Sequence, residues 1–285
     1  MTPDAAPSGG LRRCAVLGSP IQHSLSPLLH AAAYANLGLN WTYERVEVDE
    51  ERLAPFVESL DASWRGLSLT MPLKAAVLEL GAVDQLARLA GAGNTLILEA
   101  GTRRVYNTDV GGLAWAVREV TLSPLPRVTI LGAGGTARAA LIAAAQLGAE
   151  HVTVVARTPS RAEPLRTLSA EVGVGVDITP WSMPLPDADF AVSTVVSGAA
   201  DNIAQAVAAS APLVADVIYD PWPTVLASTA QQAGCTVISG RDLLVGQALL
   251  QIELMTGRPV GADVLYAALT RRLVSVHGRP GNHGR

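Results

Sequence analysis

Residues 127–147 read RVTILGAGGTARAALIAAAQL, and this stretch decides the fold of the chain. Its residues 128–131 are apolar and rich in β-branched side chains, which is typical of a buried parallel strand. A turn of the form G-x-G-x-x-A follows, and residues 138–147 favour an alanine-rich helix that Gly148 would end. A strand, a glycine turn and a helix in this order predict a dinucleotide-binding site.

The glycine turn also predicts how a pyrophosphate would be held. Gly132 allows the tight turn, Gly134 lets the backbone approach the phosphates, and the small Ala137 lets helix and strand pack closely. The start of the helix offers N–H groups and a partial positive charge. We therefore expect the phosphates to contact the whole turn, which consists of Gly132, Ala133, Gly134, Gly135, Thr136 and Ala137.

The residues after the next expected strand, at 151–155, favour NADP over NAD. NAD sites usually carry Asp or Glu at the end of this strand, where the carboxylate binds the ribose hydroxyls. Ala156 occupies that position here, and Arg157, Thr158 and Arg161 follow it. Guanidinium and hydroxyl groups can surround a 2′-phosphate, although arginines are also common on solvated loops.

Composition limits the classes of protein to consider. The 285 residues are enough for two domains, and 49% apolar with 16% charged residues is typical of a globular chain. A net charge of −4 gives no general attraction to nucleic acid or acidic membranes. The sequence shows no apolar run of about 18 residues, no signal-peptide pattern and no metal-ligand spacing of histidines. Cys14 and Cys235 are expected as free thiols in the cytoplasm.

Strand and helix patterns alternate along the rest of the chain. This alternation predicts an α/β fold of two domains, the second a doubly wound parallel sheet. Further strands are expected at 12–18, 41–48, 66–70, 95–98, 188–195, 214–217 and 235–238. Further helices are expected at 27–38, at 52–60, from 113, and at 261–273. Residues 240–247 are expected to lead into another helix that runs through 254.

Two groups of polar residues stand at strand exits in the first half. Ser24 and Ser26 precede a helix start at Pro27, where they can either hold a carboxylate or cap the helix. Thr70 and Lys74 stand at the exit of the strand expected at 66–70, which Pro72 would end. From spacing alone, capping serines and a surface lysine are the more common roles.

Six motifs in order resemble the shikimate dehydrogenase family, and the resemblance covers residues 11–273. They are G-x-P-I-x-H-S-x-S-P-x-x-H at 18–30, G-x-x-x-T-x-P-x-K at 66–74, G-A-x-N-T at 91–95, N-T-D-x-x-G at 107–112, D-x-x-Y-x-P-x-x-T at 216–224 and G-x-x-x-L-x-x-Q at 240–247. Six motifs in the right order are far more specific than any one of them.

The resemblance implies the domain division and the site residues. Residues 11–107 and the returning C-terminal helices at 246–273 would form the substrate-binding catalytic domain. Residues 108–245 would form a Rossmann-like NADP domain, and residues 1–10 and 274–285 would be disordered tails. Ser24 and Ser26 would bind the substrate carboxylate, and Lys74 would be the catalytic group, paired with Asp109. The other implied substrate-binding residues are Thr70, Asn94, Tyr219 and Gln247, and the other implied cofactor-binding residues are Val217, Gly240 and Leu243.

The implied activity is the reversible reduction of 3-dehydroshikimate to shikimate with NADPH, in the synthesis of chorismate and aromatic amino acids. A quinate or aminoshikimate dehydrogenase stays open, whereas Lys74 and Asp109 argue against a non-catalytic NADP-binding sensor. The chain departs from common family residues at Ala31, Ala156, Ser193 and Leu243. We expect a cytoplasmic enzyme with a small-molecule substrate and no nucleic-acid, membrane or metal partner. The oligomeric state is open, and a homodimer is one option.

Overall fold

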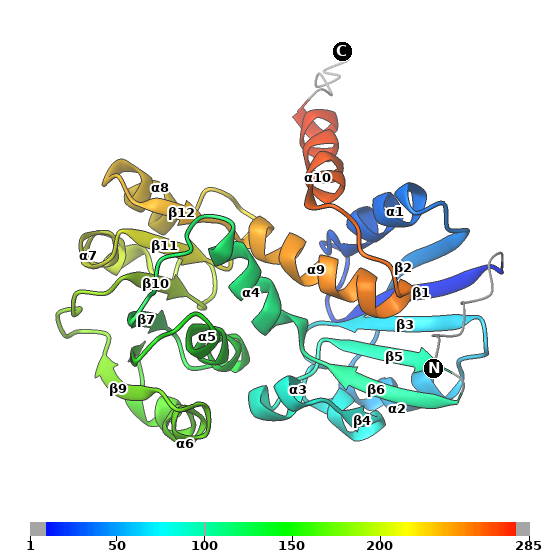
Figure 1. Ribbon diagram of the computed structural model, residues 1–285, viewed down its shortest axis with the longest axis horizontal. Coiled ribbons are helices and arrows are strands. Elements are labelled where there is room, and N and C mark those ends of the chain that lie inside the picture. The colour runs from blue at the N-terminus through cyan, green and yellow to red at the C-terminus, as the bar shows by residue number, and fades with distance from the viewer. Residues whose placement is uncertain (1–9, 100, 278–285) are drawn as a thin grey trace, which may run out of the picture. The chain divides into compact units, whose positions relative to one another are not determined.

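The chain forms two compact units in a computed structural model that describes residues 10–99 and 101–277, with side chains to residue 271 (Figure 1). Unit 1 contains the residues up to Val83, Gly93–Tyr106 and the residues from Ala248 onward. Unit 2 contains Asp84–Ala92 and Asn107–Gln247. Most of the tails expected to be disordered, at 1–9 and 278–285, lies outside the described residues.

Unit 1 is built on a mixed six-stranded sheet with the strand order β2-β1-β3-β5-β6-β4. The first three strands in this order are parallel, β5 is antiparallel to both β3 and β6, and β4 is parallel to β6. Their bounds are β1 Arg12–Gly18, β2 Trp41–Glu47, β3 Trp64–Leu69, β4 Ala82–Val83, β5 Thr95–Glu99 and β6 Thr102–Tyr106. The sequence patterns had not predicted β4 and β6.

Helices pack on the sheet of unit 1 through a cluster that joins helix and strand residues. Tyr34 and Met255, from α1 and α9, are buried together with Cys14 and Ile97 of the sheet. The helices that contribute to unit 1 are α1 Ser26–Asn36, α2 Glu50–Glu58, the 3₁₀ helix η1 Ala76–Leu80, the end of α9 Gly240–Thr256, and α10 Ala262–His277. The last helix continues four residues beyond its expected end at 273.

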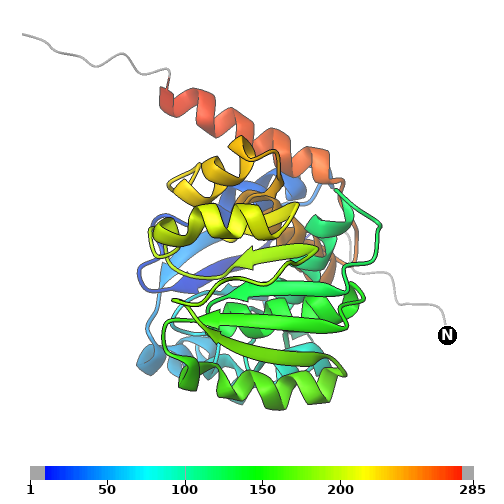
Figure 2. The same ribbon diagram turned by 90° about the vertical axis from the view of Figure 1, so that its left-hand side faces the viewer.

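Unit 2 is built on a parallel six-stranded sheet with the order β12-β11-β10-β7-β8-β9. Figure 2 shows these strands running side by side. Numbered within the unit and read from β9 to β12, the order is 3-2-1-4-5-6, which is the doubly wound order of dinucleotide-binding folds. The strands are β7 Arg127–Leu131, β8 His151–Ala156, β9 Gly175–Pro180, β10 Phe190–Ser193, β11 Leu213–Asp216 and β12 Thr236–Ile238. The fold class is therefore confirmed, although β9 had not been predicted.

Both faces of the parallel sheet are covered. Ile130 belongs to a core shared with helices α4, α5 and α6, whereas the next residue, Leu131, belongs to a core shared with α7 and α8. The helices of unit 2 are α3 Gln85–Ala90, α4 Thr108–Arg118, α5 Gly135–Gln146, η2 Pro159–Ala162, α6 Glu163–Val172, η3 Asp201–Ile203, α7 Ala204–Ser210, α8 Val225–Gln232 and the start of α9. Alternate strand residues thus serve opposite faces, as a doubly wound sheet requires.

Helices α4 and α5 begin three or more residues earlier than the sequence predicts. Helix α4 begins at Thr108 instead of residue 113, and α5 begins at Gly135 instead of residue 138. Glycine and threonine have low helix propensity, so the pattern places both starts too late. The consequence is that the N-T-D-x-x-G motif and the end of the glycine turn form first turns of helices.

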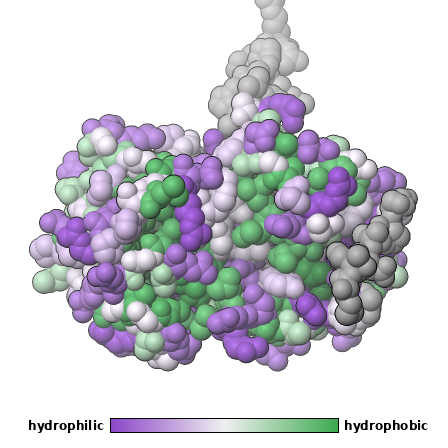
Figure 3. All heavy atoms as spheres, viewed as in Figure 1, coloured by the Kyte–Doolittle hydropathy of each residue, from purple (hydrophilic) through white to green (hydrophobic). Residues whose placement is uncertain are grey.

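Hydrophilic side chains are spread over the face of both units seen in Figure 3, with apolar side chains among them. The large exposed apolar residues include Met71, Leu122 and Val196. Within residues 10–99 and 101–277, no helix combines the length and apolar character needed to span a membrane.

Candidate active site

The predicted substrate residues of unit 1 gather at one edge of its sheet. The parallel strands β1 and β3 end there, and the antiparallel β5 begins there. The amide of Thr70 donates to the carbonyl of Leu17 at 2.9 Å, and the amide of Leu69 donates to the carbonyl of Asn94 at 2.8 Å. The first three family motifs are therefore neighbours in space, and this edge holds Ser24, Ser26, Thr70, Lys74 and Asn94.

Gly18 lets the ends of β1 and β3 approach each other. A Cβ atom at this position would lie 2.5 Å from Cγ2 of Thr70 and 2.9 Å from the carbonyl oxygen of Met71. The amide of Ser19 also donates to that carbonyl at 3.1 Å. A larger residue at position 18 would push the two motifs apart, because the second contact is to backbone.

The loop before α1 holds both predicted serines half-buried. Arg45 donates from Nε and Nη2 to the carbonyl of Ser24, at 3.0 and 2.6 Å, and fixes the loop from the side of β2. The hydroxyl of Ser24 accepts from the amide of Ser26 at 3.3 Å, and Ser26 is the first residue of α1. The N-cap position belongs to Leu25, which makes no side-chain cap, so Ser26 does not cap the helix.

The segment after β3 brings the backbone of Lys74 to the G-A-x-N-T motif. The amide of Leu73 donates to the carbonyl of Thr70 at 2.8 Å, which closes a turn around Pro72. The amide of Gly93 then donates to the carbonyl of Lys74 at 2.7 Å. Lys74 is half-buried at this edge, which is not the environment of an ordinary surface lysine.

A buried polar network that sequence reasoning missed lies next to this edge. His30 is fully buried, stacks on Tyr43 with 3.9 Å between ring centroids, and places Nδ1 3.2 Å from the hydroxyl of Tyr34. Its Nε2 lies 3.4 Å from Oε1 of Gln251, a buried residue of α9. His30 and Gln251 are 221 positions apart, so local sequence patterns could not predict their contact. The available signal was the spacing of His30 and Tyr34, which stand four residues apart on one helix face.

Acid is expected to destabilise the protein through His30. Burial lowers the pKa of His30 to about 3, from the ordinary value of 6.5 that it regains on unfolding. The unfolded state therefore binds the extra proton first, so this contribution to the free energy of unfolding is complete above pH 6.5 and declines toward pH 3. Urea unfolding at pH 7.5 and pH 5 should show a loss about 2 kcal/mol larger in the wild type than in His30→Gln. Equal losses would show that His30 is protonated in the folded state.

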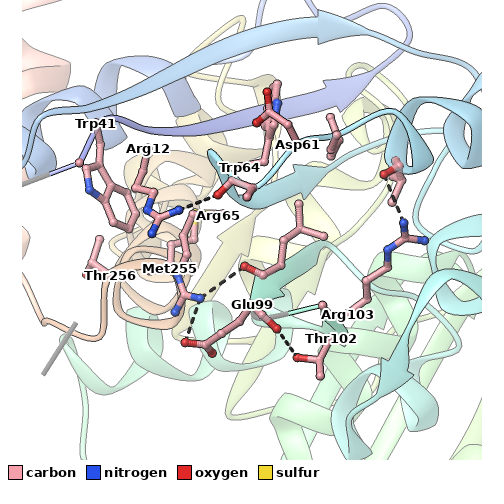
Figure 4. A pocket seen from close by; sticks show the side chains of 16 residues that line it. Arg12, Trp41, Asp61, Trp64, Arg65, Glu99, Thr102, Arg103, Met255 and Thr256 are labelled. Atoms are coloured by element: carbon pink, nitrogen blue, oxygen red, sulfur yellow. Dashed lines mark hydrogen bonds and ion pairs between the residues drawn. The ribbon is translucent and has the colours of Figure 1, made fainter. Parts of the chain in front are cut away.

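A separate cavity of about 750 Å³ lies at the opposite edge of the same sheet (Figure 4). Arg12 donates to the carbonyl of Ala62 at 2.6 Å, and Arg65 donates to the carbonyl of Met255 at 2.7 Å and pairs with Glu99 at 3.1 Å. Both guanidinium groups are therefore already engaged by carbonyl or carboxylate groups of the protein. None of the predicted substrate residues lines this cavity, so we do not assign it to the candidate site.

The glycine turn of unit 2 fits a dinucleotide phosphate. Gly132 has φ +112°, and a Cβ there would lie 2.6 Å from the hydroxyl of Thr194, so only glycine is accommodated. A Cβ at Gly134 or Gly135 would instead meet nothing within 4 Å, which leaves open space before α5. Gly134 is the N-cap and provides no side-chain cap, so the first N–H groups of α5 face this space without such a partner.

The arginine loop follows β8, the strand next to β7. Ala156 is buried, so the position that usually carries an acidic residue has no polar group to offer. Arg157, Thr158 and Arg161 are exposed, and Thr158 precedes η2. Among the described residues, neither of the two guanidiniums forms an ion pair with a carboxylate. A 2′-phosphate would meet two exposed cations here and no buried anion.

Asn107 sets the start of α4 and the position of Asp109. Its Oδ1 accepts from the amides of Asp109 and Val110 at 3.0 and 3.3 Å, and its Nδ2 donates to the carbonyl of Ala92 at 2.8 Å. Asp109 is thereby held in the first turn of α4, where the helix dipole favours negative charge.

Gln247 is positioned by a close crossing of α4 and α9. A Cβ at Gly112 would lie 2.6 Å from the backbone nitrogen of Gln247, and a Cβ at Gly246 would lie 2.5 Å from the carbonyl oxygen of Gly112. The glycines of two family motifs therefore let the two helix backbones touch. Within unit 2, this crossing joins the helices that carry Asp109 and Gln247.

The D-x-x-Y-x-P-x-x-T motif shapes the loop after β11. Asp216 is buried and accepts from the hydroxyl of Thr224 at 2.8 Å and from the amide of Ile218 at 3.2 Å. Burial raises the pKa of this carboxyl above its ordinary value. The amide of Gly240 donates a hydrogen bond to the carbonyl of Ile218 at 3.3 Å. This arrangement fixes the segment that carries the remaining predicted residues of unit 2, which are Val217, Tyr219, Gly240 and Leu243.

Comparison with known proteins gives consistent matches. The model of the shikimate dehydrogenase substrate binding domain matches residues 16–96. The chain is 36% identical over 270 residues to the shikimate dehydrogenase (NADP(+)) of Methanothermobacter thermautotrophicus, a match that covers 90% of this chain and 95% of the relative. The solved shikimate dehydrogenase of Mycobacterium tuberculosis is similar with a TM-score of 0.86 and 40% identity, over 91% of this chain and 99% of that one. The shikimate 5-dehydrogenase of Thermus thermophilus, solved with NADP(H) and shikimate, has a TM-score of 0.80 and 31% identity. This match covers 91% of this chain and 99% of that one.

Proposed function

The chain belongs to the shikimate dehydrogenase family, and we propose from this membership that it catalyses the reversible reduction of 3-dehydroshikimate to shikimate with NADPH. This activity makes it an oxidoreductase in the synthesis of chorismate and the aromatic amino acids. The observation that carries the proposal is the gathering of Ser24, Ser26, Thr70, Lys74 and Asn94 at one edge of the unit 1 sheet.

We assign the substrate groups to residues by their chemistry. Shikimate is a carboxylate with several ring hydroxyls, so it needs hydroxyl and amide partners. Ser24 and Ser26 hold the carboxylate, for which their half-buried loop beside Arg45 is suited. Lys74 and Asp109 are the proposed catalytic residues. The other ring-binding residues are Thr70, Asn94, Tyr219 and Gln247.

Lys74 is the proposed proton donor in the reduction. The oxygen of the substrate ketone gains negative charge as it is reduced, and it needs a nearby cation that can release a proton. Lys74 is the only lysine among the 21 lysine and arginine residues of the sequence. An arginine would keep its proton, whereas a lysine ammonium can release one. The use of lysine at this single position therefore supports proton transfer.

NADP is the proposed cofactor, and its reduced form, NADPH, would supply the hydride for the reduction. The open space at Gly134 and Gly135 and the uncapped start of α5 suit its pyrophosphate. Arg157, Thr158 and Arg161 suit its 2′-phosphate. Val217, Gly240 and Leu243 complete the proposed cofactor residues.

A cytoplasmic location agrees with the state of the cysteines. Cys14 and Cys235 are both free thiols, as is usual in a reducing compartment. A homodimer stays a prediction, which light scattering on the purified chain tests.

Initial rates test the proposed function directly. Shikimate and quinate should each be offered with NADP and with NAD, since these four combinations separate the competing activities. We expect shikimate with NADP to give a kcat/KM at least about tenfold above the other three, because each alternative leaves a charged or polar group without its partner. A higher value for quinate, or for NAD, would overturn the corresponding assignment.

A further inference from the structure

Gln251 is a buried amide whose hydrogen-bonding capacity is filled entirely by unit 1. Its Oε1 accepts from the hydroxyl of Ser68 at 3.0 Å and faces Nε2 of His30 at 3.4 Å. Its Nε2 donates to the carbonyl of Asn94 at 3.3 Å and to the hydroxyl of Thr95 at 3.1 Å. An amide has two donor hydrogens and two acceptor lone pairs, so all four are used.

The orientation of the Gln251 amide follows from the backbone. A backbone carbonyl only accepts hydrogen bonds, so the Gln251 atom that faces the carbonyl of Asn94 must be Nε2. Oε1 then faces His30 and Ser68. His30 is neutral because burial lowers its pKa to about 3, and with its one ring hydrogen on Nε2 it donates to Oε1 of Gln251. The partners of Nε2 and the partners of Oε1 therefore require the same orientation of the Gln251 amide.

The same logic continues through Thr95 to the side chain of Asn94. The Thr95 hydroxyl accepts from Gln251, so its single hydrogen is left to donate. It donates to Oδ1 of Asn94 at 2.9 Å. A flipped Asn94 would present its NH₂ group to Thr95, and the Thr95 hydrogen would lose its acceptor at a position that is fully buried.

We infer that Thr95 and Gln251 are positioning residues that lock the amide of Asn94 with its oxygen inward, so that its NH₂ group is presented to a hydroxyl oxygen of the substrate. The inference rests on the proposed function, in which Asn94 binds a ring hydroxyl. It adds that this hydroxyl accepts a hydrogen bond from Asn94 and donates its own hydrogen to another group. The polarity of the site is therefore set from inside the sheet by residues that do not touch the substrate.

Thr95→Val tests the inference, with Thr95→Ser as its matched control. Valine has the shape of threonine but cannot donate to Asn94, whereas serine keeps the hydroxyl. We expect Thr95→Val to raise the KM for shikimate roughly tenfold, the effect of losing one oriented hydrogen bond, with kcat and the KM for NADP changed less than about twofold. Thr95→Ser should keep a KM for shikimate near that of the wild type. Thr95→Ala gives the same comparison if the valine variant does not fold.

A purely structural role predicts a different result. It would lower the melting temperature of Thr95→Val and leave the KM for shikimate unchanged, or it would change the constants for both substrates together. Either outcome overturns the inference. A serine variant as defective in KM as the valine variant would also overturn it, because the hydroxyl would then not be the decisive group.

A double-mutant cycle identifies the residue through which Thr95 acts. In an Asn94→Ala background there is no amide to orient, so we expect Thr95→Val to cause no further rise in the KM for shikimate. Independent, multiplicative effects would show that Thr95 acts elsewhere. The activity of the wild type distinguishes a failure of the proposed function from a failure of the role proposed for Thr95. A wild type that does not oxidise shikimate removes the proposed function together with this role. An active wild type with an unaffected Thr95→Val variant removes only this role.

Discussion

Replacing Lys74 with alanine is expected to lower kcat for shikimate oxidation by roughly 10²- to 10⁴-fold, the usual contribution of a general acid–base group. The KM for shikimate should change little, because the serines proposed to hold the carboxylate stay in place. The backbone of Lys74 is already fixed by its hydrogen bond from Gly93, so the substitution removes chemistry without reshaping the loop. Steady-state kinetics at saturating NADP measures both constants.

Lys74→Arg is the matched variant, because it keeps the positive charge and withholds the proton. We expect it to be nearly as impaired as Lys74→Ala. If arginine restores most of the rate, the group acts through charge alone and the proton has another source. A normal kcat in Lys74→Ala would remove the catalytic assignment altogether.

Replacing Arg157 with alanine should lower kcat/KM for NADPH by roughly 10- to 100-fold, since hydrogen bonds to charged groups contribute about 1.5–3 kcal/mol each. Turnover with NADH should change little, because NADH lacks the 2′-phosphate. The position suits this role, since Arg157 is exposed beside β7 and β8 and the preceding Ala156 is buried. Kinetics with each cofactor and a direct measurement of NADPH dissociation by fluorescence check the prediction.

Arg166→Ala is the control for the lost charge. Arg166 is also exposed in unit 2, but it pairs with Glu163 at 3.2 Å and lies on α6 rather than on the loop after β8. It should leave the preference for NADPH unchanged. Equal losses in both variants would show that the arginine loop acts only through overall charge.

Sequence patterns were sufficient for the fold class and for the elements with strong periodicity. The strand β1 has the predicted bounds, and β7 and β8 differ from the predicted strands by one residue each. The cores of β7 and β8 are short apolar runs rich in β-branched residues, a pattern typical of buried parallel strands, which explains this success. Strand β6 was missed because its first three residues are all polar, and β9 was missed because it has only two apolar residues, Val176 and Ile178, before Pro180.

The candidate site was predictable only in part, for a physical reason. Local sequence marks Gly132 and Gly134, since a turn requires them at fixed spacing. The motifs around Thr70 and Lys74 needed a family resemblance, because a half-buried lysine and a surface lysine look alike in sequence. The network of His30 and Gln251 depends on a contact across 221 positions, which no local pattern encodes.

The buried titratable groups beneath the substrate edge do not change protonation over the pH range of an enzyme assay. Burial lowers the pKa of His30 to about 3, raises that of Cys14 to about 11 and raises that of Tyr43 above its ordinary value. None of the three gains or loses a proton between roughly pH 5 and pH 9, where acid–base catalysts commonly titrate. An inflection of the rate in that interval therefore comes from groups outside this trio. The pH–rate profile of the enzyme thus carries no contribution from the buried network that supports the site.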